Sequence, residues 1–186
     1  MNKLVVGLAG MPGSGKSIVV SVARESGYGV IVMGKEVREE ASKRGIELTP
    51  ENLGRLMLVL RQDEGEAAIA KRCIPKAENM REKRLILDGV RSLNEVDEFR
   101  KNFGKVTLIA IHASPETRFK RIHHRQRSDD SKTWKTFHER DLRELNVGLG
   151  SVMAMAEYII MNEKQVDFVK RRTIKILRRI EERWMQ

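Results

Sequence analysis

The stretch GMPGSGKS at residues 10–17 limits the possible folds of this chain, and it begins where the apolar run LVVGLAG of residues 4–10 ends. The stretch satisfies the pattern G-x-x-x-x-G-K-[ST] and lies between an apolar run and a helical pattern, as that motif requires. Its glycines let the backbone curl so that N–H groups point at phosphate oxygens. We therefore expect a nucleoside triphosphate site formed by Gly10, Met11, Pro12, Gly13, Ser14, Gly15, Lys16 and Ser17.

Lys16 and Ser17 carry the chemistry expected of this loop. Lys16 is predicted to bridge the β- and γ-phosphates as a catalytic residue, and the Ser17 hydroxyl to bind Mg²⁺. Asp88 closes the apolar run RLILD, where a carboxylate at the carboxyl end of a strand can hold Mg²⁺ through water. An ordinary Asp-Gly turn is the alternative for Asp88. The predicted cofactors are ATP and Mg²⁺, with the choice between ATP and GTP left open.

Short apolar runs alternate with helical patterns along the rest of the chain. After the first run, further strands are predicted within residues 28–33, 84–90, 105–113 and 156–163. Helices are predicted after Thr49-Pro50, where two helices flank Gly65, and after Ser114-Pro115. Strands that alternate with helices indicate an α/β fold with a five-stranded, mostly parallel sheet.

The last segment predicts an amphipathic closing helix. Its expected apolar face is formed by Val166, Val169, Leu177, Ile180 and Trp184.

Length and composition favour one globular domain over residues 1–186, because 40% of the residues are hydrophobic and 33% are charged. No apolar run approaches the length of a membrane span, and the N-terminus does not resemble a signal peptide. The single Cys73 fits a reducing, cytoplasmic location. The net charge of +10 suits either a polyanionic partner or a solvated basic surface.

Four motifs in order resemble the adenylate kinase superfamily of nucleotide kinases: GMPGSGKS, then MGKEVR at 33–38, DGVR at 88–91 and RSDD at 127–130. The chain is especially similar to archaeal adenylate-kinase-related proteins, a sister group that is also compared with dephospho-coenzyme A kinases. The resemblance implies a P-loop NTPase fold with three α/β/α layers. It also implies a small helical acceptor lobe over residues 35–80 and a short arginine-rich lid over residues 118–145.

The resemblance further implies transfer of the γ-phosphoryl group of ATP to a nucleotide-like acceptor of the nucleoside monophosphate type. Arg38 and Arg91 would then clamp the acceptor's phosphate, and Arg61 is assigned to the same substrate-binding group. Arginine suits this role because its planar fork matches phosphate oxygens.

For the donor side, the resemblance implies a catalytic role for the lid arginines Arg127 and Arg140, which would close on the triphosphate. Asn162 follows the last predicted strand, where this superfamily cups the adenine of ATP with backbone contacts. Further lid candidates are Arg121, Arg125 and Arg143.

Two positions depart from the adenylate kinase pattern and leave the acceptor open. Lys35 stands where an aspartate follows the second strand, and Glu95 stands where a glutamine reads the acceptor adenine. A dephospho-coenzyme A kinase-like activity is the alternative, but a hydroxyl acceptor calls for a general base. Lys35 is a poor base at neutral pH, since a free lysine has a pKa of about 10.4. Glu36 could substitute for it.

A P-loop ATPase that acts on RNA or the ribosome is the competing class, and a ligand-binding regulator without turnover is a third. The basic stretch KRRTIKILRRIEER at residues 170–183 would suit RNA contacts. Against this, its apolar stripe fits docking on the sheet, and aromatic residues for base stacking make up only 5% of the chain. We therefore expect a small-molecule acceptor, with no membrane partner and with the oligomeric state open.

Overall fold

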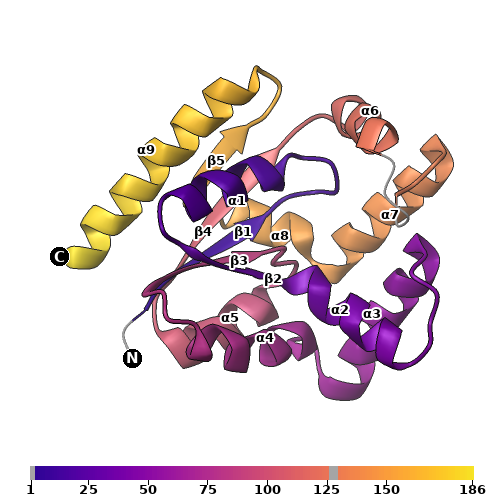
Figure 1. Ribbon diagram of the computed structural model, residues 1–186. Helices are drawn as coiled ribbons and strands as arrows, with labels where there is room; N and C mark the ends of the chain where they lie inside the picture. The colour runs from indigo at the N-terminus through magenta and orange to yellow at the C-terminus, as the bar shows by residue number, and fades with distance from the viewer. Residues whose placement is uncertain (1–2, 126–129) are drawn as a thin grey trace.

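The computed structural model describes residues 3–125 and 130–186, and its centre is a five-stranded sheet (Figure 1). The strand order is β2-β3-β1-β4-β5, and all four pairings of neighbouring strands are parallel. This confirms the predicted α/β fold and its five strands. The strands are β1 (Leu4–Ala9), β2 (Gly29–Val32), β3 (Arg84–Asp88), β4 (Val106–His112) and β5 (Tyr158–Met161).

Helices follow the strands and begin where the cap residues predict. Thr49 accepts a hydrogen bond from the backbone N–H of Asn52, and the helix starts at Pro50. That helix ends at Gly65, whose φ of 92° favours glycine, and the next one begins at Ala68. The helices are α1 (Lys16–Glu25), α2 (Met33–Lys43), α3 (Pro50–Glu64), α4 (Ala68–Asn79), α5 (Leu93–Phe103), α6 (Pro115–Arg125), α7 (Trp134–Val147), α8 (Leu149–Ala154) and α9 (Val166–Met185).

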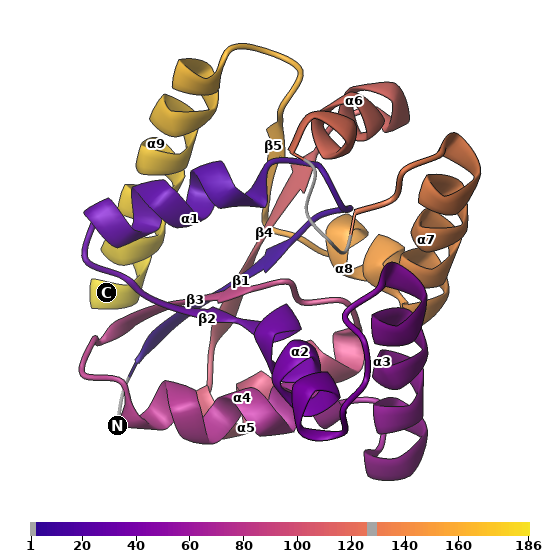
Figure 2. The same ribbon diagram turned by 45° about the vertical axis from the view of Figure 1, so that its right-hand side comes forward.

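The helices cover both faces of the sheet and make three layers. In Figures 1 and 2, α1 and α9 lie on one face, and α2, α4 and α5 lie on the other. Side chains alternate between the two layers, since Val5 joins the core beside α2–α5 while Val6 joins the core beside α1 and α9. The predicted three-layer P-loop NTPase fold is therefore confirmed. Of the helices described, none combines the length and apolar character that a membrane crossing requires.

The segment predicted as an acceptor lobe, residues 35–80, contains most of α2 and all of α3 and α4. These helices bury Val37, Leu60 and Ile69 in the same core cluster as the strand residues Val5 and Leu85. The segment predicted as a lid, residues 118–145, contains most of α6 and α7. The division of the chain into lobe and lid stays a prediction.

The closing helix α9 matches its predicted apolar face except at one end. Val169, Leu177 and Ile180 are buried, and Trp184 packs at the edge of their cluster. The prediction for Val166 is wrong, because this side chain is 51% exposed. Val166 is the first residue of α9 and lines a cavity beside the phosphate loop, so it lies outside the face that packs on the sheet.

A buried ion pair connects α3 to α5 under the sheet. Arg61 Nη2 lies 2.5 Å from Glu95 Oε1, and the two residues are only 4% and 0% exposed. The second carboxylate oxygen of Glu95 accepts a hydrogen bond from the backbone N–H of Arg91 at 2.7 Å. Ser92 caps the same helix by accepting from the Glu95 N–H. The pair therefore holds the backbone of Arg91 at the end of β3.

We predict that Glu95→Ala lowers the free energy of unfolding by about 3–5 kcal/mol, because Arg61 is left buried without its carboxylate. Urea denaturation measures the change. Asp97→Ala removes an exposed carboxylate from the same helix and serves as the control, with an expected effect within about 0.5 kcal/mol. Equal effects of the two substitutions would contradict a structural role for the pair.

Candidate active site

The phosphate loop connects β1 to α1 at the carboxyl edge of the sheet and is packed tightly against its neighbours. Gly13 and Gly15 have φ values of 80° and 98°, in the left-handed region that favours glycine. A Cβ at Gly13 would lie 2.7 Å from the carbonyl oxygen of Arg118, and one at Gly15 would lie 2.1 Å from Asn162 Nδ2. The helix starts at Lys16, so its N-terminal N–H groups face the loop, as an anion site requires.

Lys16 folds back over the loop with its ammonium group half-buried. Its Nζ donates to the carbonyl oxygen of Gly10 at 2.6 Å and to that of Met11 at 3.4 Å. Burial lowers the pKa of Lys16 to about 8, although the nearby Asp88 carboxylate acts in the opposite direction. The charge of this side chain is therefore sensitive to pH just above neutrality.

Asp88 and Ser17 line one cavity beside the loop and form a set of oxygen donors that fits Mg²⁺. Asp88 ends β3, in register with Leu8 of β1. Its Oδ1 is buried and has no hydrogen-bond partner among the described residues, so a cation would satisfy it. Within 3–125 and 130–186 no cluster of three His, Cys, Asp or Glu side chains could hold a metal. A Mg²⁺ ion here would take its other ligands from phosphate and water.

Asn162 supports the phosphate loop from the end of β5. It is 1% exposed, and its Nδ2 donates to the carbonyl oxygen of Ser14 at 2.8 Å. Arg121 Nη2 in turn donates to the backbone oxygen of Asn162 at 2.9 Å and to its Oδ1 at 3.3 Å. The sequence predicted only a backbone role for Asn162 toward adenine, and that role stays a prediction. The side-chain contact was missed because it depends on β5 lying beside β4.

Arg118 is a second support that the sequence did not reveal. Its guanidinium makes two hydrogen bonds to Asp141 of α7, at 2.9 and 2.6 Å, and a third to the carbonyl oxygen of Pro12 at 3.2 Å. It also donates to the carbonyl oxygen of Ala113 at the end of β4. One buried arginine thus connects the phosphate loop to α7, the helix that carries Arg140.

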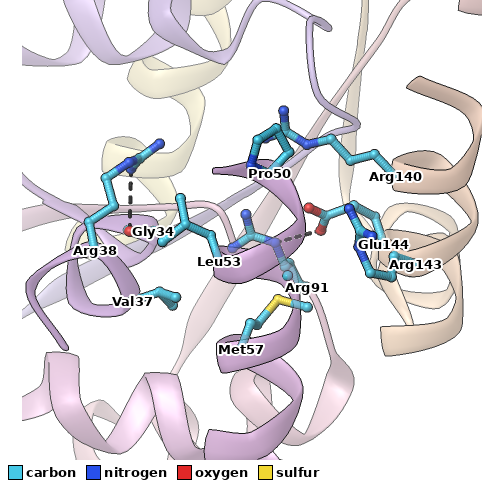
Figure 3. Close-up of a pocket in the computed structure, with 11 residues that line it drawn as sticks. Gly34, Val37, Arg38, Pro50, Leu53, Met57, Arg91, Arg140, Arg143 and Glu144 are labelled. Atoms are coloured by element: carbon cyan, nitrogen blue, oxygen red, sulfur yellow. Dashed lines mark hydrogen bonds and ion pairs between the residues drawn. The ribbon is translucent and has the colours of Figure 1, made fainter. Parts of the chain in front are cut away.

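A second pocket, lined by arginines, opens beside the loop (Figure 3). Arg38 reaches it from α2, Arg91 from the end of β3, and Arg140 and Arg143 from α7. Its apolar side is formed by Val37, Pro50, Leu53 and Met57. The cavity that contains Lys16 and Asp88 shares five lining residues with this pocket, so the two are continuous; the shared residues are Gly34, Arg38, Arg91, Arg140 and Glu144.

Glu144 is the pocket residue that sequence reasoning missed. Its Oε2 accepts a hydrogen bond from Arg91 Nε at 2.5 Å, as Figure 3 shows. Burial by itself raises the pKa of Glu144, but Arg91, Arg140 and Lys16 together lower it below the usual range. The signal in the sequence was its position four residues after Arg140, which puts both side chains on one face of α7.

Other predicted site residues lie elsewhere. Arg61 points into the core against Glu95 and is not among the residues that line the pocket, so the structure does not bring it to Arg38 and Arg91. Arg127 lies outside the described residues. Lys35 pairs with Glu39 at the surface, and Glu36 is buried against Lys76 at 2.7 Å. Neither Lys35 nor Glu36 lines the pocket.

Asp130, the last residue of the predicted lid motif RSDD, contacts two arginines. Asp130 accepts two hydrogen bonds from Arg125, at 2.8 and 2.6 Å, and lies 4.0 Å from Arg140. Arg125 lines the cavity at the phosphate loop, together with Lys16 and Arg140. Arg140 lines this cavity with Lys16, and its catalytic role stays a prediction.

Comparison with known proteins places the chain in a family. Similar proteins include a UPF0200 protein of Hyperthermus butylicus, 47% identical with 96% of each chain covered, and one of Methanocaldococcus jannaschii, 45% identical with 88% of this chain and 84% of the other covered. The chain belongs to the UPF0200 family. An AAA domain family model also matches residues 9–138.

Solved structures that resemble this UPF0200 chain show the fold. A gluconokinase from Sinorhizobium meliloti has a TM-score of 0.59 at 19% identity, with 97% of this chain and 94% of the other covered. A shikimate kinase from Acinetobacter baumannii has a TM-score of 0.60 at 14% identity, with 99% and 96% covered. The chain therefore has the same fold as these P-loop kinases.

We predict that the affinity for Mg-ATP falls as the pH rises above about 8, because triphosphate binding favours the charged form of Lys16. The decrease approaches tenfold per pH unit between about pH 8.5 and 9.5. Isothermal titration between pH 7.5 and 9.5 measures it. Lys16→Arg keeps its charge over this range and is expected to show a flat profile. A wild-type affinity independent of pH would contradict the prediction.

Proposed function

We propose that this protein is a nucleotide kinase that transfers the γ-phosphoryl group of ATP, with Mg²⁺, to a nucleotide-like acceptor of the nucleoside monophosphate type. The observation that carries this proposal is the continuity of two cavities. One contains Lys16 and Asp88 at the phosphate loop, and the other is lined by arginines; they share Arg38, Arg91 and Arg140. A donor and an acceptor that occupied these cavities would meet at the shared arginines.

On the donor side, the loop's N–H groups and the N-terminus of α1 would hold the triphosphate, with Lys16 on the β- and γ-phosphates. Ser17 and Asp88 would hold Mg²⁺, which when bound offsets the charge of the phosphates. Arg121, Asn162 and Val166 also line this cavity, and the nucleoside of ATP would lie beside them.

On the acceptor side, four guanidinium groups surround the pocket, from Arg38, Arg91, Arg140 and Arg143. Arginine binds phosphate through paired N–H groups, so this set suits an acceptor that carries a phosphate. The apolar wall of Val37, Leu53 and Met57 suits the flat face of a nucleobase.

A phosphate acceptor is also consistent with the lack of an obvious base. An ionised phosphate oxygen of the acceptor attacks the γ-phosphorus, the bond from that phosphorus to the β–γ bridging oxygen breaks, and ADP leaves with the electron pair. No proton has to be removed first. Glu36 forms an ion pair with Lys76. This pairing disfavours the dephospho-coenzyme A kinase-like alternative, in which Glu36 would act as the general base.

The transferring phosphoryl group needs positive charge around it and protection from water. Lys16, Arg125 and Arg140 line the cavity where this group would move. We assign the catalytic role to Lys16 and Arg140. Arg127 keeps its proposed role from the family resemblance.

A transfer assay tests the proposal. Purified protein is incubated with Mg-ATP and, separately, AMP, CMP, UMP, GMP and dephospho-coenzyme A, and products are separated by chromatography. We expect transfer to one nucleoside monophosphate, and a loss of about a hundredfold or more in kcat for Lys16→Ala. ATP hydrolysis stimulated only by RNA, with steep dependence on salt, would overturn the proposal in favour of the RNA-dependent ATPase.

The proposed metal role of Asp88 has its own test. We expect Asp88→Asn to raise the Mg²⁺ concentration needed for half-maximal activity by about tenfold, because a neutral amide replaces a charged ligand. A Mg²⁺ titration at saturating ATP measures the change, and Asp97→Asn, an exposed change on α5, is the control. An unchanged Mg²⁺ requirement would exclude Asp88 from the metal site.

A further inference from the structure

Glu144 is a carboxylate placed inside the group of cations that would bind the acceptor. It lines both the arginine pocket and the cavity at the phosphate loop. In the described part of the chain, Asp88 is the other carboxylate that lines these cavities. Glu144 is 7% exposed, so solvent does little to screen its charge.

Each cation near Glu144 also serves the proposed transfer. Arg91 donates to its Oε2 at 2.5 Å, and Arg140 and Lys16 are close enough to lower its pKa. Arg91 also donates to the carbonyl oxygen of Gly89, and the buried Glu95 holds its backbone N–H. The Arg91 guanidinium is therefore fixed at the end of β3 and shared between Glu144 and the pocket.

Two roles are conceivable for an acid at this place, and the geometry separates them. A general base needs appreciable proton affinity and has to face a hydroxyl group of the acceptor. Glu144 instead lies in a short ion pair with surrounding positive charge, which weakens its hold on a proton. These surroundings suit an anion that balances cations better than a group that accepts a proton.

We propose that Glu144 is a built-in counter-anion of the acceptor site, which pairs with Arg91 and gives up that partner to the phosphate of the acceptor. This inference rests on the proposed function, since it takes the acceptor to be a phosphate-bearing nucleotide. Acceptor binding exchanges one anion for another on Arg91. Glu144 thereby weakens acceptor binding and favours ligands whose phosphate carries enough charge to replace a carboxylate.

The exchange also involves α7. The Arg91–Glu144 pair joins the end of β3 to the helix that carries Arg140 and Arg143. A phosphate placed between Arg91 and those arginines would join the same two elements through attraction on both sides.

Glu144→Gln tests the proposal, because the amide keeps an oxygen for Arg91 and removes the negative charge. AMP, CMP, UMP and GMP are each titrated. For the nucleotide that the wild type accepts, we expect the dissociation constant to fall by about tenfold or more, with a matching fall in its KM. Calorimetry is done with a nonhydrolysable ATP analogue and Mg²⁺ on the donor side. Inorganic phosphate is titrated in the same way as a probe without a base.

Two variants control for charge and for folding. Glu139→Gln removes an equal charge from an exposed position on the same helix, outside both cavities, and should leave acceptor affinity unchanged. Glu144→Asp keeps the charge and should retain the weaker, wild-type affinity. Thermal melting of each variant shows whether a change in binding reflects a change in folding.

The outcomes separate this inference from the proposed function. A large fall in kcat for Glu144→Gln with unchanged acceptor affinity, together with loss of the acidic limb of the pH profile, would overturn it in favour of a base for a hydroxyl acceptor. The proposal would also be overturned if the wild type and Glu144→Gln bound inorganic phosphate with the same affinity and bound the nucleotide with the same affinity. Tighter phosphate binding by Glu144→Gln, with no transfer to any nucleotide by the wild type, would support the counter-anion and refute the proposed function.

Discussion

The carbonyl groups of the phosphate loop need hydrogen-bond donors, and these donors organise the site around the loop. A loop that turns its N–H groups toward a ligand must direct carbonyl oxygens into the protein, where they need donors. Arg118 supplies one to Pro12, and Asn162 supplies one to Ser14. These two side chains come from α6 and from the end of β5, which are far from the phosphate loop in the sequence. The loop is therefore rigid only when the carboxyl edge of the sheet is assembled.

The same contacts extend outward to the acceptor pocket. Arg118 pairs with Asp141 of α7, one residue from Arg140 and three from Glu144. On the opposite side, the buried pair of Arg61 and Glu95 holds the backbone of Arg91. A buried ion pair thus supports Arg91 on one side and the helix that carries Arg140 on the other. Removing one partner of a buried ion pair strongly destabilises a protein. The site is therefore sensitive to substitutions of residues that do not contact a substrate.

Prediction from the sequence succeeded where the physical signal was local. Thr49 and Pro50 mark the start of α3, and the apolar runs mark all five strands. The sequence pattern was less informative for charged residues, since an arginine can face a ligand, solvent or a buried carboxylate. Arg38, Arg91 and Arg140 face the pocket, whereas Arg61 lies in the core. Val166 fits the apolar stripe of α9 by its spacing, yet it lies at the end of the helix away from the sheet contact.

The phosphate loop and the α/β class follow from the sequence alone, because each depends on residues adjacent in the chain or on a regular period of apolar residues. Which charged groups surround that loop depends on the tertiary structure. Arg38, Arg91 and Arg140 come from α2, the end of β3 and α7, and the strand order brings them to one edge. The ion pair between Arg91 and Glu144 spans 53 residues of sequence. Its formation depends on how α7 packs beside the sheet, and no local pattern encodes that packing.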